Sequence, residues 1–250
     1  MLEIWVTTYF QHLTSTNCKR LKMSHGFIWV ISTNAVCLRC SLMYNKAMKK
    51  ILIVTASPRK NGNTNSLVKA FAKGLDEGNE VTYEVVDLYD LDIKPCLACR
   101  CCQTDWDEYF CMQDDDLTNG LFDQIMGADL IVLATPIYAW YCTAPMKALL
   151  DRCVYALNKY YDDVTGTHGG NRGPALWAGK KVALITTCGY KPEVGADLLE
   201  EGLRRYCKHS QLEYIGSLVE SHMGYRTEFM DDEKADHART FAKQVLQAIE

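Results

Sequence analysis

The sequence lacks both of the common nucleotide-binding fingerprints. Neither the G-x-G-x-x-G of dinucleotide-binding folds nor the G-x-x-x-x-G-K-S/T of nucleoside triphosphatases occurs in its 250 residues. The G-x-S-x-G nucleophile elbow is also absent, which removes the simplest case for a hydrolase. The six histidines show no spacing typical of metal ligands. Any nucleotide or cofactor site must therefore be built in another way.

Long apolar runs and a strong charge are also missing. No 18 apolar residues run together, so a transmembrane helix is not expected. A formal net charge of -4 gives no electrostatic reason to expect nucleic acid or an anionic membrane as a partner. Twelve cysteines in an enzyme-sized chain without a convincing export signal favour reduced thiols or metal ligands over disulfides. These features predict a cytoplasmic protein.

The first 47 residues differ from the rest of the chain. They show no sustained period of 2 or 3.6, and Met48 directly precedes the first strand-like run. We expect residues 1–47 to be an extension outside the fold and residues 48–250 to form one domain. An export signal is the weaker alternative, because polar residues interrupt the apolar stretch 27–36.

Strand-like and helix-like segments alternate from Met48 onward. The helix-like segments carry apolar stripes with a period near 3.6, and several strand-like segments are near-continuous apolar runs. Such runs are typical of parallel strands covered by helices on both faces, so the pattern predicts a doubly wound α/β sheet. The predicted strands are residues 51–55, 81–88, 130–135, 182–187 and 212–218.

The junction after the first predicted strand, ASPRKNGNT, is the most informative segment. Hydroxyl, amide and glycine residues stand directly before an amphipathic helix: Ser57, Arg59, Gly62, Asn63 and Thr64. Unpaired N–H groups and the positive end of a helix dipole attract an anion at such a junction. The loop suits a single terminal phosphate monoester, so it predicts a mononucleotide such as FMN.

Four motifs in register resemble the NADPH-dependent FMN reductase branch of the flavodoxin-like superfamily, which includes the iron–sulfur flavoproteins. They are Ser57-Pro58-Arg59-x-x-Gly62-Asn63-Thr64; Pro95-Cys96-x-x-Cys99-x-x-Cys102 with Cys111 and Asp114-Asp115-Asp116; Ala134-Thr135-Pro136-Ile137-Tyr138 with Met146-Lys147-Ala148-x-x-Asp151-Arg152; and Thr187-Cys188-Gly189. The resemblance implies the strand order 2-1-3-4-5. It also implies that Ser57, Asn63 and Thr64 hold the phosphate and that Arg59 adds positive charge.

Two further loops are expected to border the flavin ring. The loop after the third strand carries three aromatic residues, which suit a flat apolar ring. In the family this loop lies beside the isoalloxazine, and the turn after the fourth strand borders the same pocket. The predicted contacts are Pro136, Ile137, Tyr138, Ala139 and Trp140, and Thr187, Cys188 and Gly189.

The cysteine loop leaves three alternatives open. Cys96, Cys99, Cys102 and Cys111 could supply four thiolates to a [4Fe–4S] cluster. Cys111 must then fold back across an eight-residue gap, which is long for the resembling proteins. Four thiolates could also bind zinc. Free structural or redox thiols are the favoured expectation.

These observations predict an FMN-dependent oxidoreductase that uses NAD(P)H. The acceptor would be a small molecule such as a quinone, a flavin, or an azo or nitro compound, and no catalytic side chain is named. The alternatives are an electron carrier of the flavodoxin or iron–sulfur flavoprotein type, and a redox sensor that works through the cysteine loop. Lys147 and Asp151 form an i,i+4 pair expected to be a solvated helix face or, by family analogy, the seam of a homodimer. Residues 160–177 are expected to form a lid or a partner contact.

Overall fold

The structure, a computed structural model, describes residues 48–78, 81–105, 107–159, 174–224 and 227–250. The predicted extension 1–47 and most of the predicted lid 160–177 lie outside these residues. The chain divides at residue 47 into two units, and the second, residues 48–250, is the one described.

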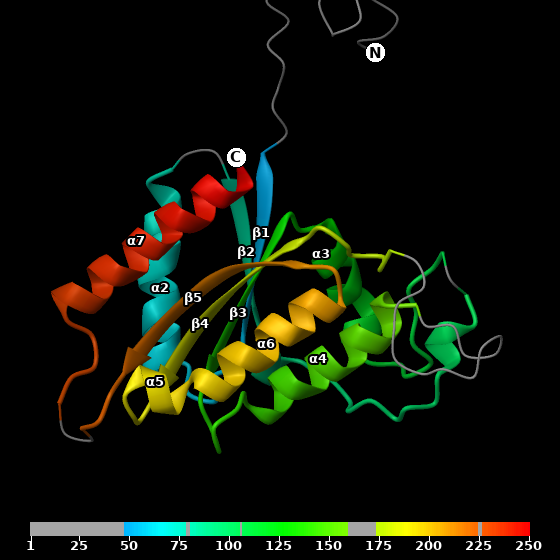
Figure 1. The fold of residues 1–250 in the computed structure, drawn as a ribbon, viewed down its shortest axis with the longest axis horizontal. Coiled ribbons are helices and arrows are strands. Elements are labelled where there is room, and N and C mark those ends of the chain that lie inside the picture. Colours follow the sequence, from blue (N-terminus) through cyan, green and yellow to red (C-terminus); the bar gives the residue numbers. More distant parts are fainter. Residues whose placement is uncertain (1–47, 79–80, 106, 160–173, 225–226) are drawn as a thin grey trace, which may run out of the picture. The chain divides into compact units, whose positions relative to one another are not determined.

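The sheet has five parallel strands in the order β2-β1-β3-β4-β5 (Figure 1). The predicted fold class and strand order are confirmed. The predicted strands lie within one or two residues of the observed ones, except at the last strand, which runs three residues further. The bounds are β1 Lys49–Thr55, β2 Val81–Asp87, β3 Leu130–Pro136, β4 Lys181–Cys188 and β5 Glu213–Ser221.

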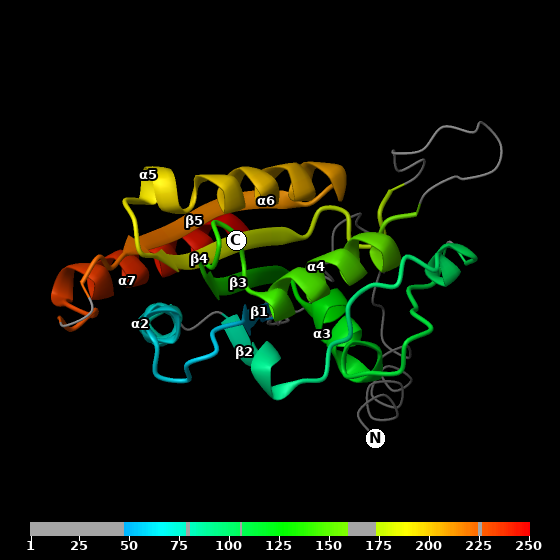
Figure 2. The ribbon, with the colours of Figure 1, turned by 90° about the horizontal axis from the view of Figure 1, so that it is seen from below.

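Helices cover both faces of the sheet (Figure 2). α2 (Asn63–Asp76) and α7 (Asp232–Ile249) pack together on one face, and α3 (Phe122–Gly127), α4 (Ala144–Leu157) and α6 (Asp197–His209) cover the other. Short helical segments complete the fold: η1 Leu88–Asp90, η2 Cys101–Gln103, η3 Leu117–Leu121 and α5 Pro192–Gly195. No helix of the described residues is long and apolar enough to span a membrane.

Each face of the sheet has its own apolar core, because successive side chains of a strand point to opposite faces. Along β1, Ile51 and Ile53 join the core under α2 and α7, while Leu52 and Val54 join the core under α3, α4 and α6. The central strands are therefore buried on both sides, which explains their near-continuous apolar sequences.

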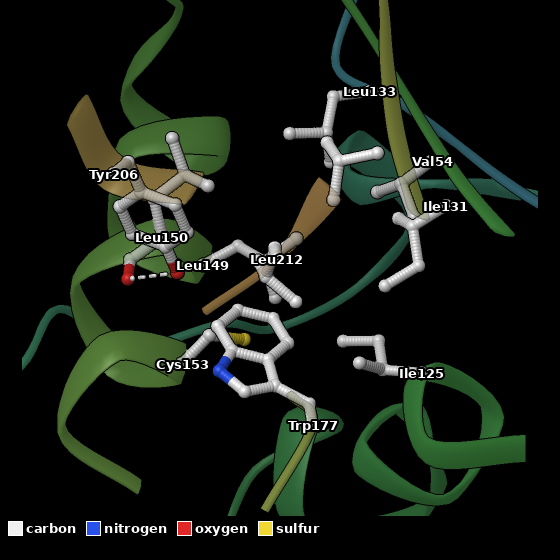
Figure 3. Close-up of a pocket in the computed structure, with 11 residues that line it drawn as sticks. Val54, Ile125, Ile131, Leu133, Leu149, Leu150, Cys153, Trp177, Tyr206 and Leu212 are labelled. Atoms are coloured by element: carbon white, nitrogen blue, oxygen red, sulfur yellow. Dashed lines mark hydrogen bonds between the residues drawn. The ribbon is translucent and has the colours of Figure 1, made fainter. Parts of the chain in front are cut away.

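A small apolar cavity remains within the core under α3, α4 and α6 (Figure 3). Val54, Ile131 and Leu133 line it from the sheet, and Cys153 and Trp177 line it from the opposite side. Trp177 donates its indole N–H to Asn158 Oδ1 at 2.9 Å. The cavity belongs to the core and not to the loops at the strand ends.

Candidate functional site

Buried threonine hydroxyls join the carboxyl ends of the three central strands. Thr64 Oγ1, in the first turn of α2, lies 2.7 Å from Thr187 Oγ1 at the end of β4. Thr143 Oγ1 donates to the carbonyl of Ala56 at 2.9 Å, and Thr186 Oγ1 donates to the carbonyl of Thr135 at 2.7 Å. The loops after β1, β3 and β4 are thereby held together at one edge, where ligands bind in open α/β sheets.

The start of α2 carries no side-chain cap. Its N-cap residue is Gly62, and the first helical hydrogen bond runs from Ser66 N to the carbonyl of Gly62 at 3.0 Å. The amides of residues 63–65 precede that bond, so the helix supplies them with no acceptor. A side chain at Gly62 would come within 3.0 Å of Arg59 Cβ and 3.1 Å of the Arg59 carbonyl. The loop is thus wound tightly at the helix start, where the amides of residues 63–65 have no acceptor within the helix.

Asn65 braces this loop from inside. Its Oδ1 accepts a hydrogen bond from Thr55 Oγ1 at 2.6 Å, and its Nδ2 donates to the carbonyls of Arg59 and Lys60 at 3.2 and 3.3 Å. Ser57 is buried, and its hydroxyl donates to the Arg59 carbonyl at 3.3 Å. Asn65 is not among the predicted site residues. Its side chain bonds to the loop backbone and so shapes the loop.

The two cations of the loop differ in their partners. Lys60 pairs with Asp87 at 2.8 Å and with Asp90 at 2.5 Å, both just after β2. No carboxylate of the described residues forms an ion pair with the exposed Arg59. Arg59 is therefore the loop's available positive charge.

The loop after β3 forms a tight two-residue turn that presents aromatic side chains. Tyr138 and Tyr141 exchange backbone hydrogen bonds of 2.9 and 3.0 Å, and Ala139 and Trp140 between them have φ values of 49° and 63°. Left-handed backbone at two successive non-glycine residues costs conformational energy, and such outliers gather at functional sites. The Trp140 ring stacks on Tyr190 from the loop after β4, with centroids 6.1 Å apart and planes 12° from parallel.

The turn after β4 presents backbone groups at the strand ends, and its thiol is not reactive. Cys188 is buried, its Sγ donates to the carbonyl of Tyr190 at 3.1 Å, and burial raises the pKa of the thiol. A neutral, hydrogen-bonded thiol is a poor nucleophile. The carbonyl of Thr187 accepts a hydrogen bond from Ile137 N at 2.8 Å, which joins this turn to the loop after β3.

The four candidate cluster ligands line one cavity. Cys96, Cys99, Cys102 and Cys111 surround it together with Arg152. Left-handed residues at Ala98 (φ 52°) and Arg100 (φ 60°) wind the backbone between the first three cysteines. Within the part of the chain that the structure describes, no group of three or more histidines, cysteines or acids is spaced to hold a single metal ion.

A buried ion pair anchors the cysteine loop to α4. The Arg152 guanidinium donates to both oxygens of Asp115, and both side chains are almost fully buried. Burial favours the neutral form of Asp115, but hydrogen bonds from Arg152 and from the amides of Lys94 and Thr118 outweigh it and lower the pKa of the carboxyl. Arg152 thus differs from Lys147 and Asp151, whose exposed pair is the solvated helix face that the sequence predicts.

Besides Asn65, two residues near the site are not among those that the sequence predicts. His222 follows β5 directly, and its Nδ1 lies 3.1 Å from Asn63 Nδ2 in the phosphate loop. The sequence predicted that this strand ends at Leu218, so it did not place His222 at the carboxyl end of the strand. Tyr89 follows β2, and burial together with the neighbouring Tyr138 phenol raises its pKa.

The sheet order and the helices on both faces define a flavodoxin-like fold. A family model for NADPH-dependent FMN reductase matches residues 49–217, and the chain belongs to this family.

The chain is similar in sequence to iron–sulfur flavoproteins and to an FMN-dependent NADH:quinone oxidoreductase. An iron–sulfur flavoprotein of Methanosarcina thermophila is 32% identical over 112 residues, which are 45% of this chain and 56% of the relative. An iron–sulfur flavoprotein of Archaeoglobus fulgidus is 26% identical over 209 residues, covering 80% of this chain and 96% of the relative. An FMN-dependent NADH:quinone oxidoreductase of Pseudoalteromonas atlantica is 28% identical over 141 residues, 52% of this chain and 67% of the relative. The first of these matches spans only about half of the relative's length.

Solved structures share the fold at low sequence identity. A flavone reductase superposes with a TM-score of 0.57 at 18% identity, covering 80% of this chain and 62% of its own. An NADH:FMN oxidoreductase in its apo form superposes with a TM-score of 0.54 at 19% identity, covering 81% and 90%.

The buried ion pair leads to a stability prediction. Asp115→Asn leaves the Arg152 charge buried without its counter-charge, so it should lower the free energy of unfolding by about 3–5 kcal/mol. Asp151 lies next to Arg152 on α4. Asp151→Asn breaks only the exposed pair with Lys147 and should lower the free energy of unfolding by no more than about 0.5 kcal/mol. Urea unfolding at pH 7 measures both.

The same pair predicts a pH dependence. Because the pKa of Asp115 is lowered in the folded state, its contribution is present above the ordinary carboxyl pKa and is lost as the pH falls through the lowered value. The stability gap between wild type and Asp115→Asn should therefore narrow in acid. Equal costs for the two variants at pH 7 would contradict this account.

Proposed function

We propose that this protein is an FMN-dependent NAD(P)H oxidoreductase that passes electrons to a small acceptor. The observation that carries the proposal is the uncapped, tightly wound start of α2, fixed by threonine hydroxyls to the loops after β3 and β4. A helix start with amides that have no acceptor in the helix, beside one cation that is unpaired in the described part of the chain, suits one phosphate monoester. Membership of the FMN reductase family supports the same cofactor.

The phosphate would be held mainly by groups that the loop already presents. The amides of residues 63–65 lie at the positive end of the helix dipole without an acceptor in the helix, and Arg59 in the same loop would supply charge. When Thr187 donates to Thr64, the Thr64 hydroxyl keeps its own hydrogen for the phosphate. Ser57 and Asn63 complete the proposed set.

The flavin ring would lie against the loops after β3 and β4. Pro136, Ile137, Tyr138, Ala139 and Trp140 form one side of this proposed pocket, and Thr187, Cys188 and Gly189 form the other. Cys188 would contribute backbone groups only, because its thiol already bonds to the Tyr190 carbonyl. Bound there, FMN would supply the hydride and electron transfer, so no side-chain acid or base is required for the hydride step. The chain's part is to orient the ring and limit water.

The acceptor is proposed to be a planar small molecule such as a quinone, flavin, azo or nitro compound. The exposed Trp140 and Tyr190 rings, stacked at the mouth of the proposed pocket, suit a flat aromatic compound. The Pseudoalteromonas relative, a quinone oxidoreductase, supports this class. We further propose a homodimer in the cytoplasm.

A second candidate function is electron transfer through an iron–sulfur cluster in the cysteine loop. The observation that favours it is the single cavity lined by Cys96, Cys99, Cys102 and Cys111, since four thiolates are the usual ligands of a [4Fe–4S] cluster. The eight-residue gap before Cys111 does not keep this thiol away from the other three. The Archaeoglobus and Methanosarcina relatives support the same candidate. Free thiols, favoured by the sequence alone, remain the alternative.

The main proposal is tested on the purified full-length chain. Denaturation should release FMN and no FAD, as measured by chromatography of the chromophore. The native protein should oxidise NADH or NADPH in the presence of a quinone, with turnover in proportion to its FMN content. Recovery of FAD, or FMN without NAD(P)H oxidation, would contradict the proposal, and the second result would favour an electron carrier.

The cluster is tested on protein prepared without oxygen. The second candidate predicts about four irons and four sulfides per chain, as expected for a [4Fe–4S] centre. Cys99→Ser should lose this iron, and Cys101→Ser, next to Cys102 but outside the proposed set, should keep it. Less than about half a cluster per chain, with FMN retained, would contradict the second candidate; zinc analysis of the same sample would then separate free thiols from a zinc site.

A further inference from the structure

His222 is held firmly against the phosphate loop. Its Nδ1 lies 3.1 Å from Asn63 Nδ2, and its Nε2 lies 3.1 Å from Thr227 Oγ1. The ring meets Phe229 edge to face, with centroids 5.5 Å apart, and its backbone N–H donates to the carbonyl of Cys188 at 2.9 Å. Three contacts of the ring and one backbone hydrogen bond therefore hold the imidazole next to a residue that the proposed function assigns to FMN phosphate.

The contacts of the ring are consistent with one tautomer of neutral His222. With Asn63 Nδ2 as the donor, Nδ1 of His222 accepts, and Nε2 carries the hydrogen and donates it to Thr227. In this state the NH₂ group of Asn63 faces His222.

We propose that His222 is a positioning residue of the FMN phosphate site and that its protonation strengthens phosphate binding. A proton on Nδ1 turns this atom into a donor, so the Asn63 amide must turn over and offer its oxygen. The Asn63 NH₂ group is then released from His222 and becomes available to an anion in the loop. The proton also adds a positive charge beside the uncapped helix end. This inference rests on the proposed function.

Two carboxylates near His222 are engaged by other groups. Glu220, two residues earlier on β5, pairs with His237 at 2.8 Å. Asp231 pairs with Lys234 at 2.5 Å, and Lys234 also lies 5.8 Å from the centroid of the Phe229 ring. Glu228 is exposed, and Arg59 in the phosphate loop has no ion-pair partner within the described ranges. The bound phosphate would therefore be the nearest unpaired counter-ion within the loop for a charged His222.

The test compares FMN affinity at two pH values for the full-length chain, stripped of flavin and titrated by fluorescence quenching. His222→Asn puts an amide oxygen where Nδ1 stood, so it keeps an acceptor for Asn63 but gains no proton. At pH 8 it should bind FMN within about threefold of wild type, and at pH 6 at least about fivefold more weakly. The result is expressed as the ratio of the FMN dissociation constant of the variant to that of wild type at the same pH. This ratio cancels the titration of FMN's own phosphate, which occurs near pH 6.

Three controls separate positioning from a merely structural role. His237→Asn, on the neighbouring helix, should leave the ratio to wild type unchanged between pH 8 and pH 6. Riboflavin, which lacks the phosphate, should bind His222→Asn and wild type equally at both pH values. His222→Gln, which also cannot take up a proton, should repeat the widening ratio if His222→Asn does not fold.

The outcomes are distinct. A ratio that widens in acid for FMN alone supports the inference. A ratio that is constant with pH, or an equal effect on riboflavin, overturns it while leaving the proposed function intact. A stripped protein that takes up no FMN overturns the proposed function itself.

Discussion

Hydrogen bonds from buried threonine hydroxyls, to one another and to backbone carbonyls, join the carboxyl ends of β1, β3 and β4. Thr64 and Thr187 join α2 to β4, and Thr143 joins the start of α4 to the residue after β1. A buried hydroxyl without a partner is costly, so these contacts specify one arrangement of the loops. The uncapped amides of α2 and the aromatic turn after β3 depend on this arrangement for their relative positions.

The loops at the strand ends differ from the rest of the fold. Two apolar cores cover the central strands on both faces, and the threonine side chains near the ends of those strands are buried and hydrogen-bonded. In the loops that follow, the amides of residues 63–65 have no acceptor in the helix, Arg59 has no ion-pair partner among the described residues, and Ala139 and Trp140 have a strained backbone. Unsatisfied donors and strained backbone persist in a stable protein where a ligand or a reaction uses them. This contrast is the physical basis of the cofactor proposal.

The sequence predicted the fold well because its signals are local. Apolar runs and stripes identify parallel strands and covering helices, and the motifs between them fall at strand ends. The sequence could not predict contacts made across the sheet. Arg152 follows Asp151 in the chain, and no pattern near it indicates that it lies buried against Asp115, 37 residues away. His222 reaches Asn63 across 159 residues, and no pattern near either residue indicates that contact.

The proposed binding of the FMN phosphate at the start of α2 is tested most directly by the ratio of riboflavin to FMN dissociation constants. This ratio is measured for the flavin-free protein in wild type, Arg59→Ala and Lys60→Ala. We expect wild type to bind FMN at least about 100-fold more tightly than riboflavin, a difference of about 2.7 kcal/mol. Arg59→Ala should reduce this preference at least about fivefold, and Lys60→Ala, whose charge is engaged by Asp87 and Asp90, should leave it nearly unchanged. Equal affinities of wild type for the two flavins would show that the phosphate is not bound there.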